Sequence, residues 1–213
     1  MEMAKLTTFK IDVKLLLYLI IAFIFTIIIG TLSHECGHFF AAKTIGFDAK
    51  IHYAFISITN YNNVEATFFR IILFTIGGPL QTILTGIIGL CLLFANKNKI
   101  LLLEKLTLKY WVYVFLSFFW LRQTFNFVMW LIEFLIRGRF PQRGDEVRLA
   151  LYFQIPEWSI AFTTALLGLI IAVYVIFKFI PLKQRLTFIL AGLIGGILGY
   201  YIWLESIGKL IMP

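Results

Sequence analysis

Five long apolar stretches, separated by short polar connections, dominate the pattern of hydrophobic and polar positions in this chain. Each stretch is long enough to cross about 30 Å of hydrocarbon as a helix that rises 1.5 Å per residue. The stretches are Leu15–Phe40, Phe68–Ala95, Tyr110–Ile136, Ser159–Ile180 and Leu186–Trp203. The pattern therefore predicts an all-α polytopic membrane protein with about five transmembrane helices.

The connection between the first two apolar stretches has a different period. Bulky residues Ile51, Tyr53 and Phe55 alternate with His52 and Ala54, which is typical of a β-strand. An asparagine-rich turn follows at residues 60–63. We therefore expect a small re-entrant β-strand element, Ile51–Ser57, after the first transmembrane helix.

The domain organisation follows from the lack of any long polar segment in the sequence. We interpret residues 1–213 as a single integral membrane domain. Its core is expected to cover residues 15–155, and a C-terminal two-helix extension to cover residues 156–213.

Composition supports a membrane location. Hydrophobic residues make up 61% of the 213 positions and charged residues only 14%, whereas about 25% is usual for soluble domains. The net charge of +8 comes from Lys and Arg in short loops, where basic residues anchor helices at the bilayer surface. These features favour the lipid bilayer as partner and exclude a nucleic-acid module. Basic residues are almost equally divided between the two sides, so the orientation of this multi-pass protein is undecided.

The main chemical signal stands near the end of the first apolar stretch. His34, Glu35 and His38 form the pattern H-E-x-x-H. On a helix the two histidines project from one face and can bind one zinc ion, while the glutamate can act on the water beside it. A polar group buried in a membrane without a hydrogen-bond or charge partner costs on the order of several kcal/mol of stability. We therefore predict a zinc site rather than an inert helix end.

A third protein ligand is needed, because two imidazoles and a water leave tetrahedral zinc one protein ligand short. The ligand must lie on the membrane side where the first stretch ends. The candidates on that side are Asp48, His52, Glu65, Glu133, Asp145, Glu146 and Glu157. Asp48 follows the motif too closely to turn back, and Glu65 lies in the asparagine-rich turn.

Two residues remain the main alternatives for the third ligand. Asp145 follows Pro141 and Gly144 and precedes a helical pattern, so a loop could turn back and present its carboxylate at a helix start. Glu133 lies in an otherwise apolar helix, where a carboxylate needs a partner. The residues alone leave both possibilities open.

Together these features resemble the site-2 protease family of intramembrane zinc metalloproteases. The resemblance covers about residues 15 to 150 and rests on the H-E-x-x-H motif, the strand-like segment, the Gly77-Gly78-Pro79-Leu80 sequence and an aspartate beyond the third span. It implies that His34, His38 and Asp145 bind zinc and that Glu35 is the catalytic base. The family's distal motif usually reads Asn, Pro, then Asp-Gly, whereas here Asn126 comes much earlier and Gly144 precedes the aspartate.

The resemblance implies an endopeptidase whose substrate is a transmembrane protein, cut within or beside the membrane. Gly77, Gly78, Pro79 and Asn126 are then expected to contact the substrate, and the strand-like segment to capture it by edge pairing. A Gly-Gly-Pro sequence equally suits a helix kink or close helix packing. Arg122, in the third stretch, is interpreted as reaching the headgroups on the side opposite the motif.

Other functions remain as alternatives. A non-catalytic zinc-binding scaffold or regulator would need His34 and His38 but no base, and Glu35 argues against it. A membrane metalloprotease of another class would use Glu133 as the third ligand. A transporter is disfavoured, because the sequence lacks a symmetric pair of broken helices. The oligomeric state is not predicted.

Overall fold

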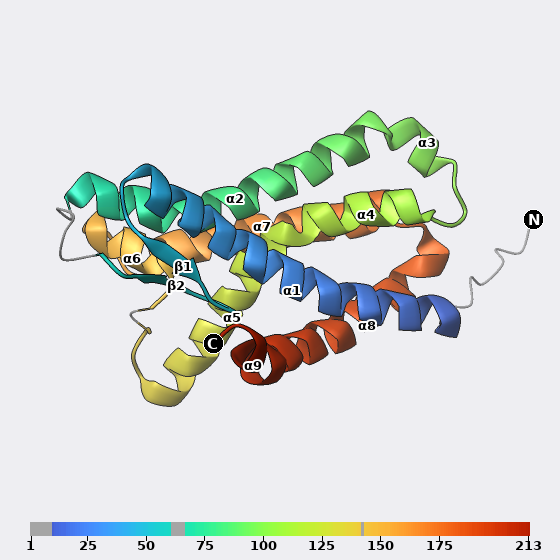
Figure 1. The fold of residues 1–213 in the computed structure, drawn as a ribbon. Helices are drawn as coiled ribbons and strands as arrows, with labels where there is room; N and C mark the ends of the chain where they lie inside the picture. The colour runs from blue at the N-terminus through green and yellow to red at the C-terminus, as the bar shows by residue number, and fades with distance from the viewer. Residues whose placement is uncertain (1–9, 61–66, 142) are drawn as a thin grey trace, which may run out of the picture.

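The computed structural model describes residues 10–60, 67–141 and 143–213, and it is predominantly helical (Figure 1). Four helices are long and apolar enough to cross a membrane. They are α1 (Val13–Thr44), α2 (Phe68–Ala95), α7 (Ser159–Phe179) and a C-terminal helix formed by α8 (Leu182–Tyr200), the π-helical η3 (Tyr201–Ile207) and α9 (Gly208–Ile211). The all-α membrane fold predicted from the hydrophobic pattern is therefore confirmed.

The third predicted span needs correction, because it is not one continuous helix. The chain forms α4 (Leu108–Ser117), the 3-10 turn η2 (Phe118–Trp120) and α5 (Leu121–Arg137). Trp120 is wedged between neighbouring helices: a Cβ added at Gly86 would lie 2.3 Å from its ring, and one at Gly168 would lie 2.4 Å from its backbone oxygen. The bend at this wedge sends α5 away from the direction of α4 (Figure 1).

The predicted β element is present, but it is a hairpin rather than a single strand. Strand β1 (Ala49–Ile51) pairs antiparallel with β2 (Ile56–Ile58). The chain reverses between them, where the His52 N–H donates to the Phe55 carbonyl oxygen at 2.9 Å. The alternation of residues from Ile51 to Ser57 therefore reflects two short strands and their connection.

The C-terminal helix holds the tip of this hairpin. The indole Nε1–H of Trp203 donates to the Tyr53 carbonyl oxygen at 2.9 Å. The Tyr53 N–H donates to the Met212 carbonyl oxygen at 3.0 Å. Figure 1 shows the C-terminus beside the hairpin. Both hydrogen-bonding groups of the Tyr53 backbone are therefore used inside the fold.

The largest apolar core lies toward the end of α1 that is remote from the H-E-x-x-H motif. Phe23 of α1 packs against Phe188 of α8 at a ring-centroid distance of 5.1 Å, and Trp111 of α4 stacks on Phe188 at 5.4 Å. On the opposite face of α1, Leu17 and Phe25 are each 57% exposed. Such outward apolar side chains suit contact with lipid, and the buried cluster fixes α1 against its neighbours.

Two short helices complete the described structure. Helix α3 (Lys97–Leu101) connects α2 to the loop before α4, and α6 (Asp145–Tyr152) follows the loop after α5. Helix α6 packs against α2 and α7. This packing brings the start of α6 to the end of α1 that carries the motif.

Candidate metal site

The three motif side chains are buried at one turn of α1. His34, Glu35 and His38 are 1%, 4% and 5% exposed. The two histidines are four residues apart, so their side chains project from the same face of the helix. Their ring centroids lie 4.8 Å apart. The geometry expected for two ligands of one ion is therefore present.

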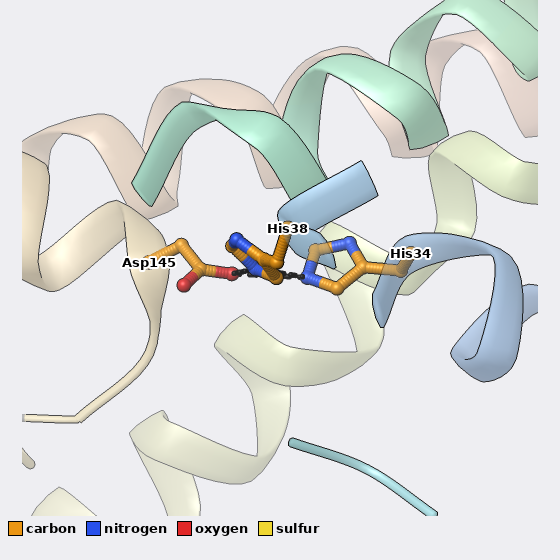
Figure 2. Close-up of side chains that lie close together, drawn as sticks. All are labelled: His34, His38 and Asp145. Atoms are coloured by element: carbon orange, nitrogen blue, oxygen red, sulfur yellow. Dashed lines mark hydrogen bonds and ion pairs between the residues drawn. The ribbon is translucent and has the colours of Figure 1, made fainter. Parts of the chain in front are cut away.

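Asp145 reaches both imidazoles from α6 (Figure 2). Its Oδ2 atom lies 3.0 Å from His34 Nε2 and 3.1 Å from His38 Nε2, and the two Nε2 atoms are 3.2 Å apart. Zinc bonds of about 2.0–2.2 Å at tetrahedral angles require donor atoms about 3.3–3.5 Å from one another. The three donor atoms are therefore close to the spacing of a metal site, and together they could hold one ion.

Glu133, the alternative third ligand, is engaged elsewhere. Its carboxylate forms ion pairs with Arg137, at 2.9 Å, and with Arg143. Asp48 pairs with Lys43 at 3.1 Å. Glu65 lies outside the described residues. Of the two main alternatives left by the sequence, the structure brings Asp145 to the imidazoles and not Glu133.

The glycine before Asp145 explains how the carboxylate enters the site. Gly144 has a φ of +95°, a backbone conformation that favours glycine. A Cβ at this position would also lie 2.4 Å from the ring of Trp130. Gly144 therefore permits both the sharp turn and the close packing that start α6. The Gly-Asp order, which departs from the resembled family's motif, has a local structural reason.

The electrostatics of Asp145 favour an ionised carboxylate. Burial opposes ionisation, but the hydrogen bonds with His34 and His38 outweigh it and hold the pKa of Asp145 below its usual range. The residue also stands in the first turn of α6, where the helix dipole favours negative charge. A metal site of this type needs its carboxylate ionised.

Hydrogen bonds from α2 orient the two imidazoles. His38 Nδ1 lies 2.8 Å from the Phe74 carbonyl oxygen, and His34 Nδ1 lies 2.9 Å from the Thr82 hydroxyl. The Thr82 hydroxyl in turn donates to the Gly78 carbonyl oxygen at 3.1 Å. When each Nδ1 carries the ring proton, each Nε2 is left free to bind a metal. Such outer partners fix ring orientation and tautomer in metal sites.

The Gly-Gly-Pro sequence lets α2 pass close to the motif. A Cβ at Gly78 would lie 2.3 Å from His38 Nε2 and 2.4 Å from His34 Nε2. A Cβ at Gly77 would lie 2.6 Å from the Gly37 carbonyl oxygen. Pro79 lies inside α2 and cannot donate a helical hydrogen bond. The contacts support a packing role for these residues, and direct contact with a substrate stays a prediction.

Arg122 is a site residue that the sequence interpretation missed. Instead of reaching the opposite headgroups, its Nη1 lies 2.9 Å from Nδ1 of His34. The bend at η2 redirects α5 and brings Arg122 inward. A guanidinium only donates hydrogen bonds, so the contact with Arg122 is a hydrogen bond when Nδ1 is unprotonated and Nε2 carries the proton that faces Asp145. In the other tautomer, which leaves Nε2 free for a metal, Nδ1 donates to the Thr82 hydroxyl. Arg122 then supplies positive charge beside Glu35 and Glu146, with which it interacts electrostatically. The charge of Arg122 within an apolar stretch was the available signal.

Two further carboxyl groups lie at the site. Among the described residues, no side-chain hydrogen bond or ion pair holds the carboxylate of Glu35. Glu146 is 3% exposed, and burial raises the pKa of its carboxyl group. Its Oε1 atom is buried without a partner in the described part of the chain, and such groups are typically satisfied by ordered water. The candidate metal site is therefore lined by two carboxyl groups that can form hydrogen bonds with water.

The position of Asn126 relative to the site follows from the face of α5 on which it lies. It is half-buried in α5, four residues after Arg122. Residues four apart on a helix are neighbours on one face. Asn126 therefore shares a face with a residue that reaches His34, and its contact with a substrate stays a prediction.

The fold and the site define a polytopic helical membrane protein with a candidate His-His-Asp metal centre inside its helices. No family model matches the chain, and no curated protein or solved structure matches it. The function is therefore argued from the site itself.

Proposed function

We propose that this protein is an intramembrane zinc metalloendopeptidase that cleaves membrane-embedded or membrane-adjacent protein segments. The observation that carries the proposal is the buried Glu35 carboxylate, adjacent to His34 and without a side-chain partner among the described residues. A purely structural metal site needs no free base at this position. The resemblance to site-2 proteases, which rests on the same residues, supports the same activity.

The donor set suits zinc. His34 and His38 offer imidazole nitrogens and Asp145 offers a carboxylate oxygen. Three protein ligands of these types, with a further coordination position left open, are characteristic of catalytic zinc sites. When bound, zinc supplies Lewis acidity that activates water and polarises a peptide carbonyl.

Glu35 is proposed to move the proton in the reaction. It would accept the proton of the attacking water and then deliver it to the nitrogen of the leaving amine, which forms the second product chain. Thr82 and Phe74 hold the two imidazoles in orientation during these steps. Arg122 offsets the negative charge that Glu35 and Glu146 bring into an apolar environment.

The hairpin is proposed to hold the substrate backbone. Hydrogen bonds of the ladder join Thr59 to Asp48 and His52 to Phe55, and bonded pairs alternate with non-bonded pairs along antiparallel strands. Ile56 and Ile58 belong to the non-bonded pairs of the register, so their backbone groups face away from β1. An unwound substrate segment could pair with this outer edge of β2.

The test combines metal content with cleavage of a model transmembrane substrate by the purified protein. We expect the wild type to contain stoichiometric zinc and to cleave, and His38→Ala to lose both properties. Glu35→Gln should keep the zinc and lose cleavage, because a ligand and a base have separable roles.

Glu133→Gln is the matched control, since it removes a carboxylate outside the site. Full zinc occupancy in His38→Ala would contradict the metal assignment. A wild type that holds zinc but never cleaves would favour the non-catalytic scaffold.

A further inference from the structure

A pocket of about 240 Å³ has Phe74, a neighbour of the candidate metal site, in its lining. Its apolar walls come from the connection between α1 and β1, from β2, from α2 and from α6. Its lining includes Phe47, Ile58, Ile71, Phe74, Tyr152 and Arg148. Pockets for whole small molecules usually measure about 300–1,000 Å³. The smaller volume suits a single large side chain.

The pocket and the metal site share one wall. Phe74 lines the pocket, its ring lies 5.2 Å from the ring of His38, and its carbonyl oxygen accepts the hydrogen bond from His38 Nδ1. Asp145 and Arg148 are three residues apart in α6, so they lie on neighbouring positions of one helix face. A chain that runs from the metal site along this face would therefore place its next side chains at the pocket.

Ile58 connects the pocket with the outer edge of the hairpin. Its side chain lines the pocket, and its backbone groups face away from β1 by the register of the sheet. Side chains of a strand paired on this edge would alternate between the two faces of the sheet. The strand side chain opposite Ile58 would thus be directed toward the same pocket.

Arg148 gives the pocket a charged rim. Its side chain is exposed, and no ion pair or hydrogen bond holds it among the residues that the structure describes. Arg137 and Arg143, which precede α6, both pair with Glu133 instead. An unpaired guanidinium beside an apolar pocket is complementary to a carboxylate attached to an apolar group.

We infer that this pocket is a specificity subsite, which binds a large apolar substrate side chain and selects, through Arg148, an acidic residue two positions along the same strand face. The inference rests on the proposed endopeptidase function. It names the substrate class as membrane-adjacent segments with a Leu-Glu pair whose two residues are separated by one position, so that both side chains share one face of the strand. It also assigns Arg148 a role in substrate selection that is separate from metal binding.

The experiment measures binding separately from cleavage. Labelled peptides that differ only in a Leu-Glu, Leu-Lys or Ala-Glu pair are titrated against full-length Glu35→Gln protein in an uncharged detergent, with fluorescence anisotropy as the readout. We expect Leu-Glu to bind about fivefold tighter than Leu-Lys, the upper range for a solvent-accessible ion pair. Ala-Glu should bind more weakly than Leu-Glu, because it leaves the pocket unfilled.

Arg148→Glu, combined with Glu35→Gln, should reverse the preference in favour of Leu-Lys. Arg139→Glu is the matched control, because Arg139 is exposed between α5 and α6 and does not line the pocket. The Arg139→Glu variant should keep the preference of the Glu35→Gln protein for Leu-Glu over Leu-Lys. Ile58→Trp should remove the advantage of Leu over Ala by filling the pocket, and circular dichroism checks that each variant is folded.

The outcomes separate this inference from the proposed function. Equal binding of Leu-Glu and Leu-Lys, or a preference unchanged in Arg148→Glu, would overturn the subsite whether or not the wild type cleaves. Cleavage that does not depend on whether the pair contains Glu or Lys would overturn the subsite and leave the proposed endopeptidase activity intact. Binding preferences that follow Arg148 in a protein that never cleaves would retain the subsite and reject the endopeptidase.

Discussion

His38 Nδ1 lies 2.8 Å from the backbone carbonyl oxygen of Phe74, as the donor and acceptor of one hydrogen bond. The contact places the ring proton on Nδ1 and leaves Nε2 facing Asp145, 3.1 Å away. The acceptor belongs to α2, one turn before the Gly-Gly-Pro sequence. The candidate metal site is therefore built from the crossing of α1 and α2 as much as from the motif on α1, and its geometry depends on how closely the two helices approach.

The first prediction concerns that approach at Gly78. Gly78→Ala should lower metal affinity by more than about 100-fold, because the new methyl group would fall within 2.4 Å of both Nε2 atoms and must displace the imidazoles. This loss is expected to exceed the 10–100-fold typical of an outer-shell change. Metal content after dialysis against a graded chelator measures it.

Gly196→Ala and Gly30→Ala are the controls for this change. Both glycines lie in membrane-spanning helices, and a Cβ at either position would meet nothing within 4 Å. These two variants should keep the metal affinity of the wild type. Tight metal binding by folded Gly78→Ala protein would show that the Nε2 atoms of His34 and His38 do not lie beside Gly78.

The second prediction separates the two candidate third ligands. Asp145→Ala should lose tight zinc binding, since it removes the only carboxylate oxygen seen within 3.1 Å of both imidazoles in the described structure. Glu133→Gln should retain zinc, because that carboxylate pairs with Arg137 and Arg143 instead. Zinc content by mass spectrometry decides between them. The reverse pattern would transfer the ligand role to Glu133.

The two histidines and Asp145 differ in how far their positions follow from the sequence. The spacing of His34 and His38 fixes their common helix face, since the geometry of a helix is local. The contact of Asp145 with the two imidazoles depends on how α6 packs. Counting the predicted spans limited the candidates for the third ligand to one side of the membrane, but it did not identify which residue is the ligand. Local patterns therefore identified the motif, while the third member of the group required the tertiary structure.

Arg122 and the hairpin illustrate the limits more sharply. The inward position of Arg122 follows from the bend at Trp120, which packs between Gly86 and Gly168. The hydrophobic pattern of the sequence does not show where a helix bends. Alternation from Ile51 to Ser57 is the same for one strand or two short ones, because side chains alternate in both. The reversal depends on a His52 to Phe55 hydrogen bond that residue types alone do not specify.

The third prediction tests the orientation of His34 by Thr82. Thr82→Val removes the hydroxyl that lies 2.9 Å from His34 Nδ1 and keeps the shape of the side chain. Metal affinity should fall by about 10–100-fold, as is typical when an outer-shell partner is lost. Thr82→Ser retains the hydroxyl and should stay close to the wild type. An unchanged affinity in Thr82→Val would show that the Thr82 hydroxyl does not control the orientation of His34.

The fourth prediction concerns substrate capture on the outer edge of β2. Tyr53→Pro is unsuitable as a test, because the Tyr53 N–H is already bonded to Met212. Ile56 is the better position, since its N–H faces away from β1 by the strand register and it is the first residue of its strand, where proline is tolerated.

Ile56→Pro should reduce cleavage of the model transmembrane substrate about tenfold, the effect of losing roughly one well-placed backbone hydrogen bond of about 1.4 kcal/mol in the transition state. Zinc content should not change, because Ile56 is remote in sequence from the ligands and makes no hydrogen bond to them in the described structure. Ser57→Pro is the contrasting variant, as Ser57 belongs to a bonded pair with Lys50 and should disrupt the hairpin itself. Unchanged turnover in a folded, zinc-loaded Ile56→Pro protein would leave the hairpin as a packing element and place substrate capture elsewhere.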